Sequence, residues 1–426
     1  MRQQTSVVFR DVRVLGDGDR PIERGSVWVE GGRIATVDGE PSAPGELKVV
    51  AGEGLTLMPG LIDAHLHILG ISSYDFDVWM MEDPALHVAR GVADMARLVD
   101  AGFTTVRDAG SDTSLGLKAA QREGSIRGPR MWASGRWISS TGNLPDIPHL
   151  PFCVTHNRGM GVVADGVDEC RRAVREQIRA GADIIKIAST GGIDPSFVVA
   201  EYTWSDDELR AIVDTAHGFG RRVSVHNNVL PGVPPTGMRR ALAAGVDTIE
   251  HGYFVPDDVL AAMAERGTWL VVTASYLKLV SEGGRKYGLS DIYVDKATLA
   301  LESVLDTIPR ARRAGVRIAC GSDLLGTPLD PHGTNAMELG ILRDAGFSDR
   351  EVVRVATKAN AEALGIDGWT GRIAEGYAAD LLLVEGRPDE DIEVLTDPGR
   401  IKYVMVAGVE QKDEISADRA GAGVGS

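Results

Sequence analysis

Four histidines and one aspartate have the residue types and positions that metal chemistry requires. His65 and His67 stand two residues apart at the end of a strand-like run, and alternate residues of a strand point to the same side. His226 and His251 end two further runs of β-branched and apolar residues, and Asp323 follows a third. Imidazole nitrogens and carboxylate oxygens are ligands that zinc and similar divalent ions accept. The pattern therefore predicts that these five side chains converge on a metal site.

One lysine interrupts an apolar run that should be buried. Lys186 lies in the sequence ADIIKIA, residues 182–188, which is typical of a strand covered on both faces. A buried ammonium group is costly unless it is paired or neutralised. Reaction of the neutral amine with carbon dioxide would give a carbamate whose two oxygens could each hold a metal cation. Lys186 is therefore a candidate bridging ligand, and the alternative is a partly buried ion-pair partner.

Glycines mark the elements that must position these residues. A helical pattern, a glycine and a short β-branched run follow one another six times, with the glycines where helix C-caps need a left-handed residue. These glycines are Gly102, Gly181, Gly220, Gly245, Gly267 and Gly315. Residues 57–65 and 129–134 add two strands and bring the expected total to eight. Eight strand–helix units over about 250–300 residues predict an α/β fold of the (β/α)8 barrel type, whose active sites lie at the carboxyl ends of the strands.

The two ends of the chain differ from the middle. Residues 7–37 and 371–409 contain strand-like runs separated by hairpin turn sequences. Neither end has enough strands for an independent sheet, so we expect them to pair into one small β-sandwich domain. The expected organisation is residues 1–58 and 367–414 in the β-domain and residues 59–366 in the barrel. Residues 415–426 are small and polar and are expected to be a disordered tail.

Several longer motifs resemble those of the amidohydrolase superfamily over nearly the whole chain. They are PGLIDAHLH (59–67), GADIIKI (181–187), IEHG (249–252), GSD (321–323), PHGTNAMEL (331–339), ATKANAEALG (356–365) and GRIAEGYAADLLLVEG (371–386). The chain looks most similar to the branch that contains Xaa-Pro dipeptidases, or prolidases, and imidazolonepropionase-like hydrolases.

The resemblance implies a centre of two divalent metal ions, most often zinc. It implies that His65, His67 and Asp323 hold a buried ion, that His226 and His251 hold an exposed one, and that carboxylated Lys186 bridges them. Two such ions can share a hydroxide whose pKa is lowered towards neutrality. Asp323 would act as the general base and later protonate the leaving amine, while the exposed metal polarises the scissile carbonyl.

Further roles rest on position alone. Tyr253, next to IEHG, could donate a hydrogen bond to a developing oxyanion. Asp63 is a candidate for a carboxylate that orients a ligand histidine, with the capping of a turn as the alternative.

Substrate contacts are expected in the loops that follow the strands, above all in the long loop of residues 137–164. The candidates are Asn143, Arg158, Asn227 and Asn228, with Arg158 as a bidentate partner for a substrate carboxylate. Several dipeptidases of this branch carry Thr-Gly-Gly-His and His-Ala where this chain has TGNL (141–144) and HNN (226–228).

We therefore expect cleavage of an amide in an Xaa-Pro dipeptide or a related N-acyl amino acid. The main alternative is a hydrolase of small non-peptide amides, carbamates or ureas, including xenobiotics. A heterocycle deaminase should lack Lys186, and a silent binding relative should lack metal ligands.

Composition narrows the classes of partner. The 426 residues include 45 basic and 61 acidic residues, for a net charge of −16. An acidic chain without a basic stripe disfavours nucleic-acid binding. No apolar run reaches the roughly 18 residues of a membrane-spanning helix. Three scattered cysteines form no CxxC pair and predict neither a disulfide framework nor a thiolate zinc site. We expect a cytoplasmic enzyme with a small-molecule substrate, and a homo-oligomer is left open.

Overall fold

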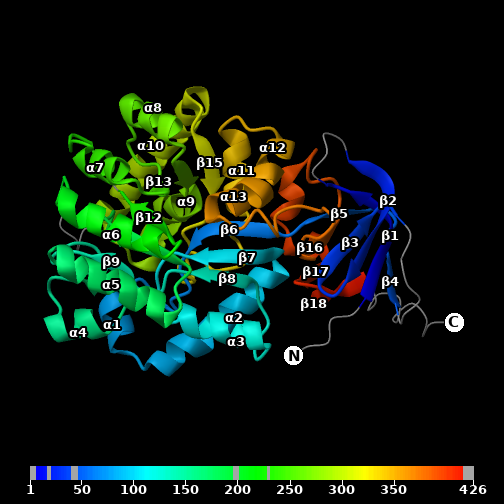
Figure 1. The fold of residues 1–426 in the computed structure, drawn as a ribbon, viewed down its shortest axis with the longest axis horizontal. Coiled ribbons are helices and arrows are strands. Elements are labelled where there is room, and N and C mark those ends of the chain that lie inside the picture. The colour runs from blue at the N-terminus through cyan, green and yellow to red at the C-terminus, as the bar shows by residue number, and fades with distance from the viewer. Residues whose placement is uncertain (1–5, 17–20, 40–46, 195–200, 228–230, 416–426) are drawn as a thin grey trace.

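The computed structural model describes residues 6–16, 21–39, 47–194, 201–227 and 231–415. Within these ranges the strands form three sheets, and Figure 1 shows the helices around the two parallel ones and the third sheet beside them. One of the three sheets contains strands from both ends of the chain. The chain thus has a mixed α/β fold with parallel sheets.

Ten strands lie in the two sheets whose pairings are all parallel. The smaller sheet has the order β6 (Leu61–Leu66), β7 (Phe103–Asp108) and β8 (Arg130–Ala133). The larger has the order β10 (Gly161–Val163), β9 (Trp137–Ser139), β11 (Ile184–Ala188), β12 (Arg222–His226), β13 (Thr248–His251), β14 (Trp269–Val272) and β15 (Arg317–Cys320).

Backbone contacts join the two parallel sheets at two places. The N–H of Asp323 donates to the carbonyl of His65 at 2.8 Å, which brings the end of β15 against the end of β6. The N–H of Asp183, just before β11, donates to the carbonyl of Ala133 in β8 at 2.8 Å. The side chain of Asn360 also bridges the carbonyls of Ile62 and Cys320 at 2.6 and 2.9 Å. These contacts bring the ligand-bearing strand ends close to one another.

Helices follow most of the parallel strands. The longer ones are α2 (Pro84–Asp100), α3 (Ser114–Glu123), α5 (Val167–Ala180), α6 (Asp206–Gly218), α7 (Thr236–Ala244), α8 (Asp257–Arg266), α9 (Ala274–Gly283), α10 (Asp291–Ala314) and α11 (Met337–Asp344). Shorter ones are α1 (Phe76–Met81), α4 (Phe152–Asn157), α12 (Asp349–Arg354) and α13 (Asn360–Leu364), with a π-helical turn at Val355–Ala359.

The glycine pattern correctly predicts six strands. Each marked run forms one, and Gly181, Gly245, Gly267 and Gly315 are the left-handed C-caps of the helices before them. A glycine meets this need because it adopts positive φ without a steric penalty.

The prediction of one strand over residues 57–65 is wrong. The chain divides at Gly60 into β5 (Leu55–Pro59), which joins the sheet of the two ends, and β6, which joins the parallel sheet. A side chain is excluded at Gly60, because its Cβ would lie 2.0 Å from Oγ1 of Thr104. The long loop of residues 137–164 is also more ordered than expected, since it contains β9, α4 and β10.

Strands from both chain ends share the third sheet. Its order is β18 (Val409–Asp413), β17 (Ile401–Val406), β16 (Leu381–Glu385), β5, β1 (Ser6–Val14), β2 (Ile22–Glu30) and β3 (Arg33–Val37), with β4 (Leu47–Ala51) also paired to β1. The antiparallel pairing of β5 with β16 joins the two ends. The ion pair between Arg13 and Asp389 adds a second link, with both side chains nearly buried.

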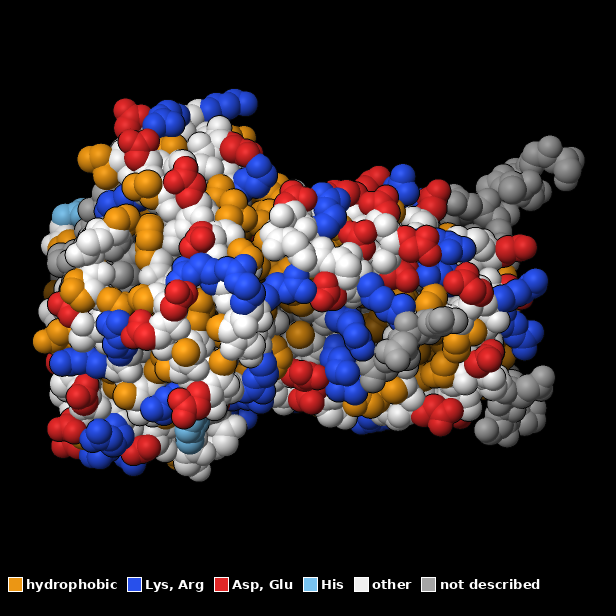
Figure 2. All heavy atoms as spheres, turned by 90° about the horizontal axis from the view of Figure 1, so that it is seen from above, with side chains coloured by type: hydrophobic (Ala, Val, Ile, Leu, Met, Phe, Trp, Pro, Cys, Tyr) orange, Lys and Arg blue, Asp and Glu red, His pale blue; other side chains and the backbone are white. Residues whose placement is uncertain are grey.

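The outer surface mixes charges of both signs. On the face in Figure 2, acidic and basic side chains alternate without an extended region of one sign. None of the helices in the described ranges combines the length and the apolar character needed to cross a membrane.

Candidate metal centre

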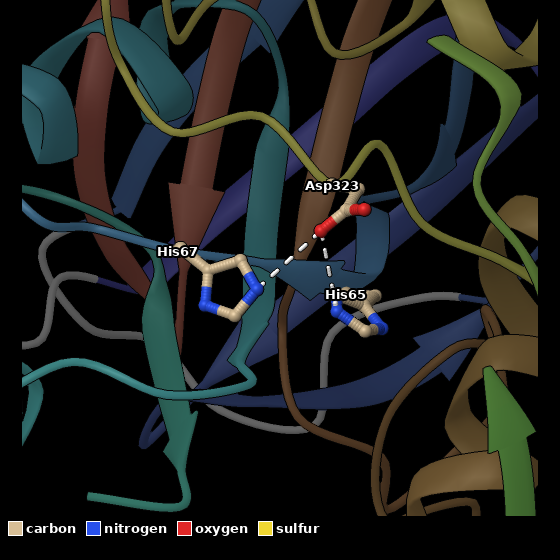
Figure 3. A group of neighbouring side chains, drawn as sticks. All are labelled: His65, His67 and Asp323. Atoms are coloured by element: carbon tan, nitrogen blue, oxygen red, sulfur yellow. Dashed lines mark ion pairs between the residues drawn. The ribbon is translucent and has the colours of Figure 1, made fainter. Parts of the chain in front are cut away.

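Three of the predicted ligands form a compact group at the carboxyl ends of β6 and β15. Nε2 of His65 and Nε2 of His67 both lie 3.4 Å from Oδ1 of Asp323, and Figure 3 shows the three side chains pointing toward one another. All three are buried, and their ligand atoms lie within 4.8 Å of one another. Two imidazole nitrogens and one carboxylate oxygen form a donor set that suits a divalent ion such as zinc.

The other two histidines lie next to the same carboxylate. Nδ1 of His226 lies 2.8 Å from Nε2 of His251, and Nδ1 of His251 lies 3.4 Å from Oδ2 of Asp323. The rings of His65 and His251 are 4.8 Å apart between centroids. Asp323 thus approaches His65 and His67 with one oxygen and His251 with the other.

Lys186 lies at the same place. Its Nζ is 3.3 Å from Nε2 of His65, and the side chain is 1% exposed. Burial lowers the pKa of Lys186 to about 8, although Glu250 and Asp323 oppose the shift. Burial therefore favours the uncharged amine, which is the form that can react with carbon dioxide.

Burial favours the neutral form of His65, His226 and His251. Burial, reinforced by the charge of Lys186, lowers the pKa of His65 well below its usual value and that of His226 to about 3. Burial and His226 likewise lower the pKa of His251. Metals bind the neutral imidazole, so these side chains are in the state that a ligand must have.

Glu250 orients the ring of His65. Its Oε2 lies 2.6 Å from Nδ1 of His65 and 2.5 Å from Nη2 of Arg107, and Ser224 donates to its Oε1 at 2.6 Å. Burial by itself would raise the pKa of Glu250, but Arg107 and Lys186 outweigh it and lower the pKa. An ionised carboxylate that accepts the Nδ1 proton leaves Nε2 of His65 with its lone pair toward the centre.

The sequence reading missed this role of Glu250. The indication was available, because Glu250 is an acidic residue directly before the predicted ligand His251 in a strand that the barrel would bury. The Nδ1 atoms of His67 and His251 are also held, by the carbonyl of Gly110 at 2.9 Å and by Oγ1 of Thr273 at 2.8 Å.

Asp63 joins the strand ends at His65 and Ser322. Its carboxylate accepts the N–H of His65 at 3.0 Å, the N–H and hydroxyl of Ser322 at 3.1 and 2.6 Å, and Nδ2 of Asn335 at 2.8 Å. Asp63 therefore holds the backbone of His65 and of Ser322, the residue before Asp323, while Glu250 orients the ring of His65.

A cavity of about 630 Å³ opens beside the centre. Five of the predicted ligands line it, with His65 behind them, and its other walls are largely aromatic and aliphatic. These walls comprise Phe76, Trp137, Leu144, Met160, Gly192, Ile193, Asp194, Tyr253, Tyr276, Tyr293 and Leu325. The Tyr253 ring stacks on His251 at 5.0 Å, and burial together with Asp323 raises the pKa of its phenol. Tyr253 therefore stays protonated and can donate a hydrogen bond.

Three of the predicted substrate contacts, Asn143, Arg158 and Asn227, do not line this cavity. Asn143 donates to the carbonyl of Ala188 at 3.0 Å and to Thr203, and Oδ1 of Asn227 accepts from Ser189 at 2.5 Å. Both asparagines are buried. Asn228 lies outside the described residues.

Arg158 has partners of another kind. Its Nη1 donates to the carbonyls of Met80 and Glu82, at the end of α1, at 3.2 and 2.9 Å. The short helix α4 ends just before Arg158, and this path of the chain brings the guanidinium to α1 rather than to the cavity wall.

Comparison with known proteins adds to this geometry. The model of the amidohydrolase family matches residues 56–410. The chain is 30% identical to an ochratoxinase of Aspergillus niger, with 95% of this chain and 86% of the relative covered.

Two solved structures show the same similarity. One is a prolidase complexed with N-methylphosphonate-L-proline, with 33% identity, a TM-score of 0.88 and coverage of 96% of this chain and 100% of the other. The second is a Xaa-Pro dipeptidase with bound methionine, with 28% identity, a TM-score of 0.84 and coverage of 95% and 99%. The chain belongs to the amidohydrolase family and is a hydrolase of carbon–nitrogen bonds.

Proposed function

We propose that this enzyme cleaves the amide bond of an Xaa-Pro dipeptide or a related N-acyl amino acid with the aid of two divalent metal ions. The observation that carries the proposal is the convergence of His65, His67 and Asp323 beside the His226–His251 pair and Lys186. The similarity to a prolidase and to a Xaa-Pro dipeptidase supports the substrate class.

The donor set suggests how the ions would be divided. His65, His67 and Asp323 would hold one zinc-like ion, His226 and His251 the other, and Lys186 in its carboxylated form would bridge them. When bound, such a pair supplies Lewis-acid activation of water and of the scissile carbonyl.

Asp323 is the proposed proton carrier. It lines the cavity and is 8% exposed, so its carboxylate can reach both the attacking water and the departing amine. It would accept a proton from the water and pass that proton to the nitrogen of the leaving group. Tyr253, protonated and stacked against His251, would donate a hydrogen bond to the carbonyl oxygen as negative charge develops there.

We also propose that β6–β8 and β11–β15 together form the (β/α)8 barrel. The contacts of β6 with β15 and of β8 with β11 support this arrangement. The division proposed is residues 59–366 for the barrel and residues 1–58 and 367–414 for the small β-domain.

One observation favours the second candidate function. Among the described residues, the lining of the cavity includes Lys186 but no other lysine and no arginine, so a substrate carboxylate would lack an obvious cationic partner. An amide, carbamate or urea without a carboxylate would not need one.

A substrate screen separates the two functions. The metal-loaded enzyme should be offered Xaa-Pro dipeptides, N-acyl amino acids, aryl ureas and carbamates under identical conditions. Preferential cleavage of the first two groups is expected. A strong preference for compounds without a carboxylate would overturn the dipeptidase proposal and leave the second function.

A further inference from the structure

Away from the predicted metal ligands, the one charged side chain in the described lining of the substrate cavity is acidic. Asp194 lines it, and the same residue also lines an outer hollow that shares Phe76 with the cavity. The outer hollow adds Asp75 and Asp77, and it contains neither lysine nor arginine among its described lining residues. A substrate that enters through this hollow therefore meets carboxylates and aromatic rings.

Two tyrosines form a hydrogen-bonded pair in the wall of the cavity. The hydroxyls of Tyr276 and Tyr293 lie 2.5 Å apart, and both side chains are almost completely buried. Asp194 and Tyr293 line the same cavity, and burial together with the charge of Asp194 raises the pKa of Tyr293. One hydroxyl donates a hydrogen bond to the oxygen of the other. The remaining lone pairs of the two oxygens can accept hydrogen bonds.

We propose that Asp194 and Tyr293 bind the protonated α-amino group of the substrate. This inference rests on the proposed amidohydrolase function and narrows its substrate to amides whose acyl part carries a free amine. An ammonium group needs acceptors for its N–H bonds, and the Asp194 carboxylate and the Tyr293 hydroxyl are acceptors. The rings of Phe76 and Tyr293 offer π faces, which also attract cations.

An anionic group of the substrate fits poorly beside Asp194. A substrate carboxylate placed beside Asp194 would face a like charge in a largely apolar cavity, where that repulsion is weakly screened.

Four related amides test the proposal. Phe-Pro has both an amine and a carboxylate, and 3-phenylpropionyl-proline lacks only the amine. The pyrrolidine amides of phenylalanine and of 3-phenylpropionic acid lack the carboxylate and differ from each other in the same amine. The value of kcat/KM for each, measured with the metal-loaded enzyme, separates the effect of the amine from that of the carboxylate.

The amine-bearing member of each pair is expected to react about 10-fold or more efficiently than its partner, because a hydrogen bond to a charged group is lost without it. Asp194→Asn should remove most of this preference, so that the two members of each pair react with similar efficiency. Circular dichroism and metal analysis of the variant check that it is folded and loaded. Tyr293→Phe should reduce the preference by a smaller factor.

Asp75→Asn is the matched control, because it removes the same charge from the outer hollow alone and keeps an oxygen to cap α1. It should change the preference by less than about 2-fold. Equal or better cleavage of the amine-free compounds would overturn the amine proposal and leave the dipeptidase proposal intact. Equal losses in Asp194→Asn on both members of a pair would overturn it as well.

The dipeptidase proposal fails separately. Cleavage of the two pyrrolidine amides without cleavage of the two proline compounds would overturn it, and the amine effect would then be read from the cleaved pair. Cleavage of none of the four would overturn both proposals.

Discussion

Oε2 of Glu250 lies 2.6 Å from Nδ1 of His65, and neither side chain has any exposure to solvent. Because the carboxylate accepts a hydrogen bond from Nδ1–H, the ring of His65 has one tautomer and one orientation available. Arg107 completes the arrangement by pairing with the same oxygen at 2.5 Å. The candidate metal centre is therefore supported by a buried ion pair that lies outside the predicted ligand set.

Glu250→Gln is expected to weaken metal binding about 10–100-fold, as the loss of an outer partner of a ligand histidine commonly does. The affinity can be measured by competition with a chelator. Ser224→Ala is the control, because Ser224 also bonds to Glu250 but makes no contact with His65. An unchanged affinity in Glu250→Gln would show that the carboxylate does not set the ligand geometry.

Lys186→Ala should lower turnover by at least about 10–100-fold, which is the loss seen when a residue that supports a metal ligand is removed. It should also reduce the bound metal from two ions towards one. Removing a buried amine leaves room for a small carboxylate, so added acetate should restore part of both quantities. Elemental analysis and turnover are the measurements. Two tightly bound ions in the variant, with or without acetate, would contradict the bridging role.

Asp323→Asn should lower turnover by about 100-fold or more, since a positioned general base and acid typically contributes that much. The amide keeps the size and most hydrogen bonds of the carboxylate, so circular dichroism and thermal unfolding should change little. Metal content should be determined for the same sample. A variant that holds wild-type metal and keeps more than about a tenth of the turnover would remove Asp323 as the proton carrier.

The Arg13–Asp389 pair predicts an acid-sensitive step in the stability of the shared sheet. Burial by itself raises the pKa of Asp389, but the hydrogen bond and charge of Arg13 outweigh it and lower the pKa. The pair therefore stabilises the fold above the unfolded pKa of about 3.9, and this contribution is lost as the pH falls through the lower folded value.

Asp389→Asn should reduce the free energy of unfolding at neutral pH by about 1–3 kcal/mol, and its loss of stability on acidification should be shallower than that of the wild type. Urea unfolding of both proteins at several pH values, from neutral to about 3 and thus through the unfolded pKa of Asp, tests this expectation. Parallel curves for the two proteins would show that other carboxylates govern the acid response.

Much of the scaffold follows from short-range rules. Left-handed glycines after amphipathic helices locate the strands, and the strand ends place His226, His251 and Asp323. The predicted ligands His65 and His67 also come together as their two-residue spacing suggests. Local sequence is sufficient here because each helix cap and each strand is specified by neighbouring residues.

Long-range contacts explain what could not be predicted. The partners of Arg158 depend on where a loop with its own strands turns back against α1. The target of Asp63 is a serine 259 positions later in the chain. The division at Gly60 separates two strands whose partners are distant in the chain, since β5 pairs with β16 and β6 with β7.

The pairing of β5 with β16 has a consequence for the folding of the nascent chain. Gly60 alone separates β5 from β6, the strand that carries His65, yet the antiparallel partner of β5 is formed by residues 381–385. His65 and His67 are therefore synthesised long before that partner. In a nascent or truncated chain that ends before β16, the edge of β5 that pairs with β16 would be exposed. Strands of other chains could pair with this edge, directly beside the strand that carries the predicted ligand His65.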